Sequence, residues 1–311
     1  MSSSSAESIL SRSLSLGRKK PVTRAAMMAK TDSNSYKSVK SLIRAIRNCK
    51  TAAEERDLIS REAAEIRMAL QNTSISRGKE KKRYRALAKL LCIQLLTAAH
   101  GGISVAFGQL DALKLMASPN FADKRLGHLG ISLLLDSSQE TLVLATNSFK
   151  SDLSGGMPSL PTLSSNGCSM YVTGLALTSL ASLLTSGMAQ ELSTELLRLL
   201  NVPNAYILKK AVLAVLKMIR TLSDASLRQD GLYEMILERT RPLLSDRNHG
   251  VLLSSCALIS ELALRSVGTP IFLELKKLAP LLVRVLSSLL FSSSFPEYDV
   301  GGTTDPFLQV F

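Results

Sequence analysis

The residues best suited to chemistry, three histidines and four cysteines, stand far apart in this 311-residue chain. His100, His128 and His249 show no spacing typical of metal ligands. The cysteines form no C-x-x-C pair and lie among apolar or small residues, so we expect buried thiols in a reducing cytosol. They are Cys49, Cys92, Cys168 and Cys256. No phosphate-binding loop and no Ser–His–acid or Cys–His arrangement can be argued. We therefore predict no enzymatic activity, no metal and no cofactor.

A run of basic residues at 79–85, KEKKRYR, is the strongest candidate for a binding site. Lys81, Lys82 and Arg83 fall in the first turns of a predicted helix, where the helix dipole disfavours cations by about 0.3–1 kcal/mol per exposed charge at most. No structural reason for this placement is visible in the sequence. A helix start where backbone N–H groups and lysine side chains converge is suited to an anion, so we interpret the run as an anion-binding site. A solvated charge run is the alternative.

The net charge of +13 is concentrated at one end of the chain. Residues 1–100 carry 21 Lys and Arg against 8 Asp and Glu, whereas residues 101–311 carry 17 of each. A negatively charged partner is therefore expected to meet the N-terminal end. A solvated basic tail is the simpler explanation for part of this excess.

The elements that must position these residues are helices. The stretch at 107–136 reads as a helical pair, with Phe107, Leu110, Leu113 and Met116 sharing one side of the first helix. A break at 118–120 follows, and Asn120 can cap a second, almost wholly apolar helix. Gly127 and Gly130, three apart in that helix, would let a neighbouring helix come close. Such a pair is the repeating unit of an α-solenoid.

The same scheme continues along the chain, with unit starts near residues 107, 138, 188, 226 and 270. Outside one wide gap, this spacing of roughly 30–45 residues is typical of HEAT and armadillo units. We therefore predict an all-α fold, an α-solenoid of helical hairpins over residues 38–311. The uncharged stretch at 168–189 has serines and threonines along one side, so we interpret it as a core helix rather than a membrane span.

Two segments fall outside this scheme. Residues 1–37 are rich in Ser, Lys and Arg, and we expect a disordered extension, with an organellar transit peptide as the alternative. Residues 154–167 form a Gly/Pro/Ser-rich segment that we expect to be a flexible insert in the gap between units.

Several segments carry a resemblance to a known family. They are LIRAIRNCKTAAEERDLI from Leu42, AKLL at 88–91, FGQLDALKLMAS from Phe107, FADKRLGHLGISLLLD from Phe121, YILKKAV from Tyr206, NHGVL at 248–252 and DPFLQV at 305–310. In this order, from about Ser38 to Val310, the sequence resembles the N-terminal trunk of the gamma-adaptins, large chains of the heterotetrameric clathrin adaptor. Members of that family continue beyond DPFLQV into a longer trunk, a hinge and an appendage. The resemblance therefore implies that this chain is a fragment or a truncated gene model.

The resemblance implies a scaffold that acts in vesicle-mediated protein transport and assembles with beta-type large, medium and sigma adaptor chains. It implies a cytoplasmic protein, peripheral on membranes of the trans-Golgi network, endosomes and clathrin-coated vesicles. Clathrin would be reached only through parts that this chain lacks. It also implies recruitment by an Arf-family GTPase and a phosphoinositide, and no nucleic acid as a partner.

The resemblance assigns roles to three groups of residues. Phosphoinositide contact falls on Lys79, Lys81, Lys82, Arg83 and Arg85, where charge-assisted bonds to a headgroup and about 1 kcal/mol per cation near an anionic leaflet would contribute. The side near the sigma chain and acidic-dileucine cargo falls on Arg44 and Arg47, for which an exposed helix face making surface pairs is the alternative. The GTPase-facing surface falls on Leu110, Leu113 and Leu144, for which ordinary core packing is the alternative.

Two other functions compete with the adaptor. A basic-armed α-solenoid could bind RNA through its phosphates, although Tyr36 and Tyr84 are the only aromatic residues in the basic stretch. A karyopherin-like transport receptor shares the architecture and should lack these motifs. We also expect the isolated chain to be unstable or to aggregate without a sigma partner, since a solenoid needs terminal repeats with a polar outer face.

Overall fold

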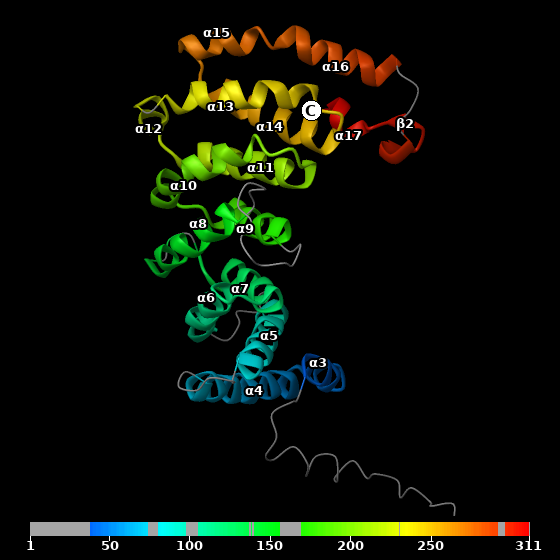
Figure 1. The fold of residues 1–311 in the computed structure, drawn as a ribbon. Helices are drawn as coiled ribbons and strands as arrows, with labels where there is room; N and C mark the ends of the chain where they lie inside the picture. The colour runs from blue at the N-terminus through cyan, green and yellow to red at the C-terminus, as the bar shows by residue number, and fades with distance from the viewer. Residues whose placement is uncertain are drawn as a thin grey trace, which may run out of the picture.

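The computed structural model describes residues 38–73, 80–97, 105–136, 138, 140–155, 169–229, 231–291 and 296–310. Within these ranges, helices stack in successive pairs from α3 and α4 at one end to α15 and α16 at the other (Figure 1). One cluster of buried apolar residues runs through most of the stack, from Leu42 to Leu278. The predicted all-α solenoid is confirmed.

The N-terminal end is built from three helices, α3 (Val39–Arg47), α4 (Ala52–Thr73) and α5 (Glu80–Thr97). The Ser38 side chain accepts a hydrogen bond from the Ser41 N–H and begins α3 as predicted. At the next break the Thr51 hydroxyl accepts from the Glu54 N–H at 3.2 Å, but the Glu54 carboxylate accepts from the Lys50 N–H, one residue earlier than in a capping box. The buried side of α4 runs through Ile59, Ile66 and Leu70.

The helical pair at 107–136 forms as predicted. A short turn η3 (Ala106–Gly108) leads into α6 (Gln109–Met116), and α7 (Phe121–Leu134) packs along α6. The Asn120 side chain accepts from the Ala122 N–H and caps α7. A Cβ atom at Gly127 would lie 2.2 Å from the Met116 backbone nitrogen, so this glycine is required for the close approach of the two helices.

The middle of the stack contains four further helices after a short turn, η4 (Glu140–Ala145). They are α8 (Thr146–Ser154), α9 (Ser169–Leu183), α10 (Ser186–Leu199) and α11 (Ala205–Thr221). Helix α8 ends at Ser154, the first residue of the predicted insert at 154–167, and the residues of that segment from 156 onward lie outside the described part. Asn204 caps α11, which packs along both α9 and α14.

The C-terminal end runs through α12 (Asp224–Gln229), α13 (Leu232–Thr240), η5 (Arg241–Ser245), α14 (His249–Arg265), α15 (Pro270–Lys276) and α16 (Ala279–Phe291). Asn248 caps α14, and Pro280 lies in the first turn of α16, where a proline is tolerated. A turn η6 (Pro296–Tyr298), strands β1 (Asp299–Val300) and β2 (Thr303–Thr304) and helix α17 (Pro306–Val310) follow. The antiparallel strands turn at Gly301 and Gly302, whose φ angles of 60° and 82° a glycine adopts without strain. This hairpin was predicted as a loop.

Two sequence interpretations of side-chain burial were wrong. Leu110 on α6 and Leu129 on α7 are about half exposed, and α6 buries Ala112, Leu115 and Met116, so only Met116 of the residues spaced three apart is fully buried. Ser179 was assigned to a polar outer side of α9, yet it is buried. Within the described residues, no helix is both long and apolar enough to cross a bilayer.

Candidate functional site

The basic cluster at the start of α5 is only partly free to bind a ligand. Lys81, Lys82 and Arg85 are exposed, whereas Lys79 lies outside the described residues. The Arg83 side chain is 16% exposed, and its Nε atom lies 3.1 Å from Oδ1 of Asp111, which is buried in α6. Arg83 thus has the structural role that the sequence did not reveal, since it connects α5 to the following helical pair.

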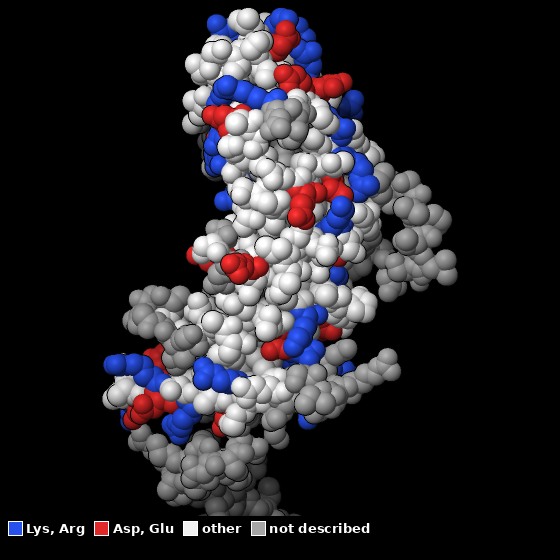
Figure 2. All heavy atoms as spheres, turned by 90° about the vertical axis from the view of Figure 1, so that its left-hand side faces the viewer, with Lys and Arg blue, Asp and Glu red and all other residues white. Residues whose placement is uncertain are grey.

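The surface around this end is electrically mixed. Figure 2 shows Lys and Arg interspersed with Asp and Glu at the lower end of the face it presents, and a mostly uncharged middle. Exposed arginines on α4 donate to carbonyl groups of their own helix, as Arg56 does to Ala52 at 3.2 Å. The cations available to an anion at the start of α5 are therefore a small group, Lys81, Lys82 and Arg85, rather than part of a broad positive surface.

Arg44 and Arg47 are exposed in the last turn of α3. Cations at this end of a helix complement the helix dipole, which gives both residues a modest structural reason to be there. The helix itself is held by Leu42, which is fully buried against the core. Both guanidinium groups therefore lie on a fixed outer surface next to the start of the stack.

The three leucines predicted to face a GTPase have different surroundings. Leu110 on α6 is 54% exposed and Leu144 in η4 is 65% exposed, and the neighbouring Val143 is equally open. Leu113 is partly buried and packs against the core. The structure therefore leaves Leu110 and Leu144 available for contact and uses Leu113 mainly for packing.

A buried chain of polar side chains joins α7, α8 and α9, and the sequence did not reveal it. His128 Nε2 donates to Asp152 Oδ2 at 3.1 Å, and His128 Nδ1 lies 3.1 Å from the Ser179 hydroxyl. Lys124 Nζ donates to Asp152 Oδ1 at 2.7 Å and to the Met116 carbonyl at 2.9 Å. Asp152 on α8 thereby binds two side chains of α7, and His128 extends the network to Ser179 on α9.

An acid, an imidazole and a hydroxyl in this order are the groups of a nucleophilic triad. His128 is only 1% exposed and Ser179 only 4%, and Phe149 packs edge-on against the imidazole. A nucleophile must be reached by the substrate it attacks, so this chain of groups is a structural network of the core. The signal was invisible in the sequence because the residues come from three separate helices.

A second polar contact brings together two motifs of the sequence. His249 Nδ1 lies 2.7 Å from Asp305 Oδ2, so NHGVL at the start of α14 meets DPFLQV in α17. The His249 ring stacks on Tyr298, with 4.2 Å between ring centroids. Leu252 and Leu308 join Leu289 in a small separate core cluster. The His249–Asp305 contact, the stacking of His249 on Tyr298 and the apolar cluster therefore attach the hairpin and α17 to α14.

The described cysteines form no disulfide bond. Cys49, Cys92 and Cys256 are free thiols, Cys168 lies outside the described residues, and burial raises the pKa of all three described thiols. They are half-buried rather than fully buried as predicted. Across the described ranges, no group of three or more His, Cys, Asp or Glu residues is placed to hold a metal ion.

Comparisons with known proteins agree with the fold. The family model for the adaptin N terminal region matches residues 55–311. AP-1 complex subunit gamma of Dictyostelium discoideum is 39% identical over 88% of this chain and 27% of that protein. AP-1 complex subunit gamma-1 of Mycosarcoma maydis is 40% identical over 88% of this chain and 28% of that protein. AP-1 complex subunit gamma-like 2 of Homo sapiens is 37% identical over 88% of this chain and 31% of that protein. The chain spans less than a third of the length of these relatives.

Proposed function

This chain belongs to the adaptin N-terminal region family, and we propose that it is a non-enzymatic large-chain subunit of a heterotetrameric clathrin adaptor in vesicle-mediated protein transport. The observation that carries the proposal is the match to AP-1 gamma subunits along 88% of the chain, over a solenoid that follows the matched region from α4 to α17. The RNA-binding and karyopherin-like alternatives receive no support from these relatives.

As partners we propose beta-type large, medium and sigma adaptor chains, of which the sigma chain would contact this part of the trunk. The test is co-expression of the full chain with a sigma-type chain of the same organism, followed by affinity purification and gel filtration. A stoichiometric complex is the expected result. Recovery of the chain alone, soluble and monodisperse in the presence of excess sigma chain, would contradict it.

We further propose that the complex is peripheral on cytoplasmic membranes of the trans-Golgi network and endosomes, through a phosphoinositide at the start of α5. Lys81, Lys82 and Arg85 support this, since they are exposed beside the helix start, whereas Arg83 is engaged by Asp111. Replacing Lys81, Lys82 and Arg85 by Ala should weaken flotation of the assembled complex with phosphoinositide-containing liposomes. Each cation removed should cost about 1 kcal/mol.

The matched control is a double change, Arg56→Ala and Arg61→Ala, which removes exposed cations from the neighbouring helix α4. Because these arginines donate to their own helix at Ala52 and Asp57, we expect liposome binding close to that of the unchanged protein. Equal losses of liposome binding in both variants would mean that binding depends on positive charge in general rather than on a specific site at the start of α5.

Arg44 and Arg47 are proposed to receive acidic-dileucine cargo together with the sigma chain, because they are exposed on a fixed helix at the same end of the stack. Arg44→Ala with Arg47→Ala should weaken binding of an acidic-dileucine peptide to the gamma–sigma pair. Lys40→Ala, an exposed cation on the same helix, is the control. An unchanged peptide affinity in the double variant would remove these residues from the site.

An Arf-family GTPase is proposed to contact Leu110 and Leu144, whose side chains are more than half exposed. Leu110→Asp and Leu144→Asp should reduce capture of the complex by immobilised GTP-loaded Arf without changing its circular dichroism. Leu264→Asp, at a leucine that is even more exposed on helix α14, is the control. Clathrin would be engaged by parts of the adaptor that lie outside this chain.

A further inference from the structure

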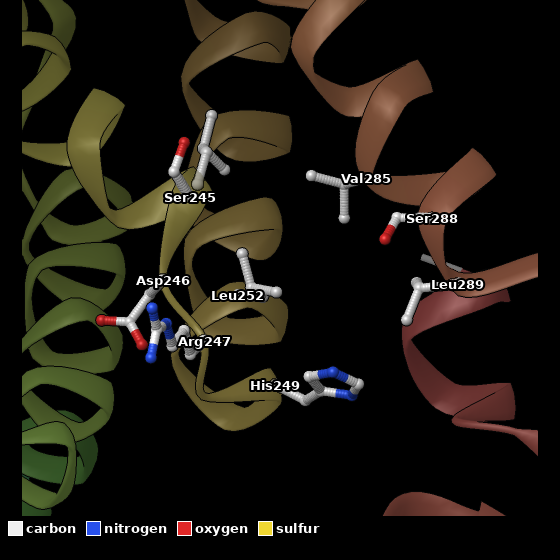
Figure 3. A pocket seen from close by; sticks show the side chains of 9 residues that line it. Ser245, Asp246, Arg247, His249, Leu252, Val285, Ser288 and Leu289 are labelled. Carbon is white, nitrogen blue, oxygen red and sulfur yellow. The ribbon is translucent and has the colours of Figure 1, made fainter. Parts of the chain in front are cut away.

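A cavity of about 460 Å³ lies between α14 and α16, and Leu252, Val285 and Leu289 point into the space between the helices (Figure 3). A second cavity, of about 230 Å³, borders the same helix α16. The first cavity is also lined by one carboxylate and one guanidinium group, those of Asp246 and Arg247. Their charges balance, so neither the apolar wall nor the charges select a class of ligand.

A carboxylate near the other end of the stack, that of Asp111 on α6, lies between two cations. Its Oδ1 atom is 3.1 Å from Nε of Arg83 on α5 and 3.7 Å from Nζ of Lys114 on α6 itself. The Asp111 side chain is 10% exposed and that of Lys114 is 49% exposed. Oδ1 accepts no hydrogen bond from the described residues. Two ion pairs therefore hold this buried oxygen, and neither is aligned as a hydrogen bond.

This arrangement allows one cation to replace the other at Asp111. A buried carboxylate that loses its partner is strongly unfavourable. Asp111 keeps a partner when Arg83 leaves, because the Lys114 ammonium is already within ion-pair distance. Side chains three residues apart on a helix are neighbours, so a rotation of the Lys114 side chain brings its ammonium closer to the carboxylate. Departure of Arg83 therefore leaves Asp111 paired.

A phosphate at the start of α5 is suited to draw Arg83 away. Arg83 is the fourth residue of α5, and helical side chains tilt toward the N-terminal end of their helix. Lys81 and Lys82 are exposed at that end. A guanidinium group binds a phosphate through two parallel N–H bonds, whereas its contact with Asp111 lacks hydrogen-bond alignment. A phosphate held by the exposed lysines therefore offers Arg83 a better-aligned partner than Asp111.

The exchange reaches the surface that was assigned to a GTPase. Lys114 lies four residues after Leu110 on α6, so the two side chains share one face of the helix. A protein that covers Leu110, which is 54% exposed, also takes the Lys114 ammonium out of water. That desolvation costs less when the ammonium is closely paired with a carboxylate. Asp111 thus connects the start of α5 to the exposed side of α6.

We propose that the contact between Arg83 and Asp111 is an autoinhibitory contact between the phosphoinositide site and the GTPase-facing surface. A phosphate ester at the start of α5 takes Arg83, Lys114 replaces it at Asp111, and the surface around Leu110 becomes easier to cover. Because coupling between two binding sites is reciprocal, a bound GTPase in turn strengthens phosphate binding. The inference rests on the adaptor function proposed above and adds a way of regulating it.

The test measures this coupling on the assembled adaptor complex. Surface plasmon resonance gives the affinity for GTP-loaded Arf with and without a soluble inositol phosphate headgroup, and the affinity for the headgroup with and without Arf. Both affinities should rise by the same factor, about fivefold or more, which is the lower end of typical couplings. Phosphatidylcholine vesicles that contain a phosphoinositide should raise Arf binding likewise. A rise with the soluble headgroup alone would contradict a membrane ligand.

Two variants distinguish an exchange of partners from a fixed structural pair. Asp111→Asn removes the charge that holds Arg83, so the headgroup affinity should rise severalfold without Arf and the coupling should disappear. Lys114→Gln removes the replacement cation at a half-exposed position where the fold tolerates a change. It should abolish the coupling, while the headgroup still binds through Lys81 and Lys82. The coupling is a ratio of affinities, so direct effects of Lys114 on the GTPase cancel.

Lys277→Gln is the matched control, because Lys277 also pairs with an acid three residues away, Glu274, at the far end of the stack. It should leave the coupling unchanged. If the headgroup and Arf both bind but neither changes the affinity for the other, the inference is overturned and the adaptor function stands. A coupling that persists in Asp111→Asn would come from the field of the bound phosphate and would also overturn it. Absence of binding of either ligand to the folded complex would overturn both the inference and the proposed membrane sites.

Discussion

Different interactions hold neighbouring helices together at the two ends of the solenoid. From α4 to α8, buried charges connect helices, as Glu62 and Lys89 join α4 to α5 and Asp152 on α8 pairs with Lys124 and His128 on α7. Toward the C-terminal end, the pair between Arg220 and Glu261 on α11 and α14 lies nearer the surface, although His249 and Asp305 still form a buried contact there. There, apolar packing is interrupted by two cavities beside α16.

This difference teaches how each end specifies its arrangement. A buried charge is costly to remove from water, and only a well-placed partner offsets that cost. A shift of α4 against α5 would leave Glu62 and Lys89 unpaired, so we infer that the N-terminal end tolerates one register. Aliphatic side chains have no such directional requirement. The C-terminal end can therefore open a recess at a smaller cost.

The largest effect is expected at Asp152, because one carboxylate serves two basic partners. Asp152→Ala leaves Lys124 and His128 buried without their acceptor, and should lower the local stability of α7 and α8 by about 3–5 kcal/mol. Amide hydrogen exchange followed by mass spectrometry measures the loss in these helices. Glu191→Ala, an exposed acid on α10, should change exchange little. Unchanged protection of α7 in the Asp152 variant would show that the network is not structural.

The pair between Glu62 and Lys89 allows a sharper test of the same idea. Glu62→Ala leaves the Lys89 ammonium buried without this carboxylate, and should destabilise α4 and α5 by about 3 kcal/mol or more. Glu62→Leu together with Lys89→Leu removes both charges and should restore most of that stability. Urea unfolding monitored by circular dichroism compares the two variants. If the double leucine variant is less stable than the Glu62→Ala variant, the ion pair adds net stability to the fold, beyond fixing how α4 and α5 align.

The sequence predicted the helical stack well because its signals are local. Asn120 begins a helix at the predicted place, since an asparagine side chain satisfies the free N–H groups of the first turn, and Asn204 and Asn248 cap later helices in the same way. The Gly-Gly hairpin at 301–302 was missed because a two-residue strand carries no detectable alternation of polar and apolar residues. Exposure was harder to predict, as Leu110 shows, because it depends on which helix packs on which face.

The candidate sites were predictable only where one segment contains them. The exposed cations of α5 follow each other in the sequence, whereas the partner of Arg83 is Asp111, far along the chain on another helix. The same limit hid the contact of His128 with Asp152 and Ser179. The cavity beside α16 could not be predicted from the sequence either, because its size depends on how closely several helices pack against each other.

Leucine truncations should separate the two ends directly. Leu177 is fully buried in α9, so Leu177→Ala should cost about 3–5 kcal/mol. Leu289 already borders both cavities and has fewer neighbours to lose, so Leu289→Ala should cost about 1–2 kcal/mol. Hydrogen exchange in α9 and α14 reports each loss locally. Equal costs would mean that the C-terminal end is packed as tightly as the middle.

Thiol reactivity offers a smaller and local readout of the C-terminal cluster. Burial raises the pKa of the Cys256 thiol, so little thiolate is present at pH 8 and alkylation by iodoacetamide should be slow, rising as the pH approaches the pKa. Leu308 lines the same cavity as Cys256, so Leu308→Ala should accelerate alkylation of Cys256 severalfold. Cys92 on α5, whose pKa burial also raises, is the internal reference. Equal acceleration of both thiols would indicate general unfolding.

The smallest effect is expected at two adjacent serines of α14, which differ only in their hydrogen bonds. The Ser255 hydroxyl is fully buried and finds no hydrogen-bond partner among the described residues, whereas Ser254 donates to the carbonyls of Gly250 and Val251 at 3.0 Å. Removing an unsatisfied buried hydroxyl relieves its desolvation cost, so Ser255→Ala should stabilise α14 by up to about 1 kcal/mol. Ser254→Ala should destabilise it by a similar amount at most, since it gives up a satisfied bond. Both changes bring the same gain in helix propensity, so the difference between the two variants in urea unfolding isolates the hydrogen bond. If the Ser254 variant were the more stable of the two, the stability of α14 would depend more on helix propensity than on the hydrogen bonds of its buried hydroxyls.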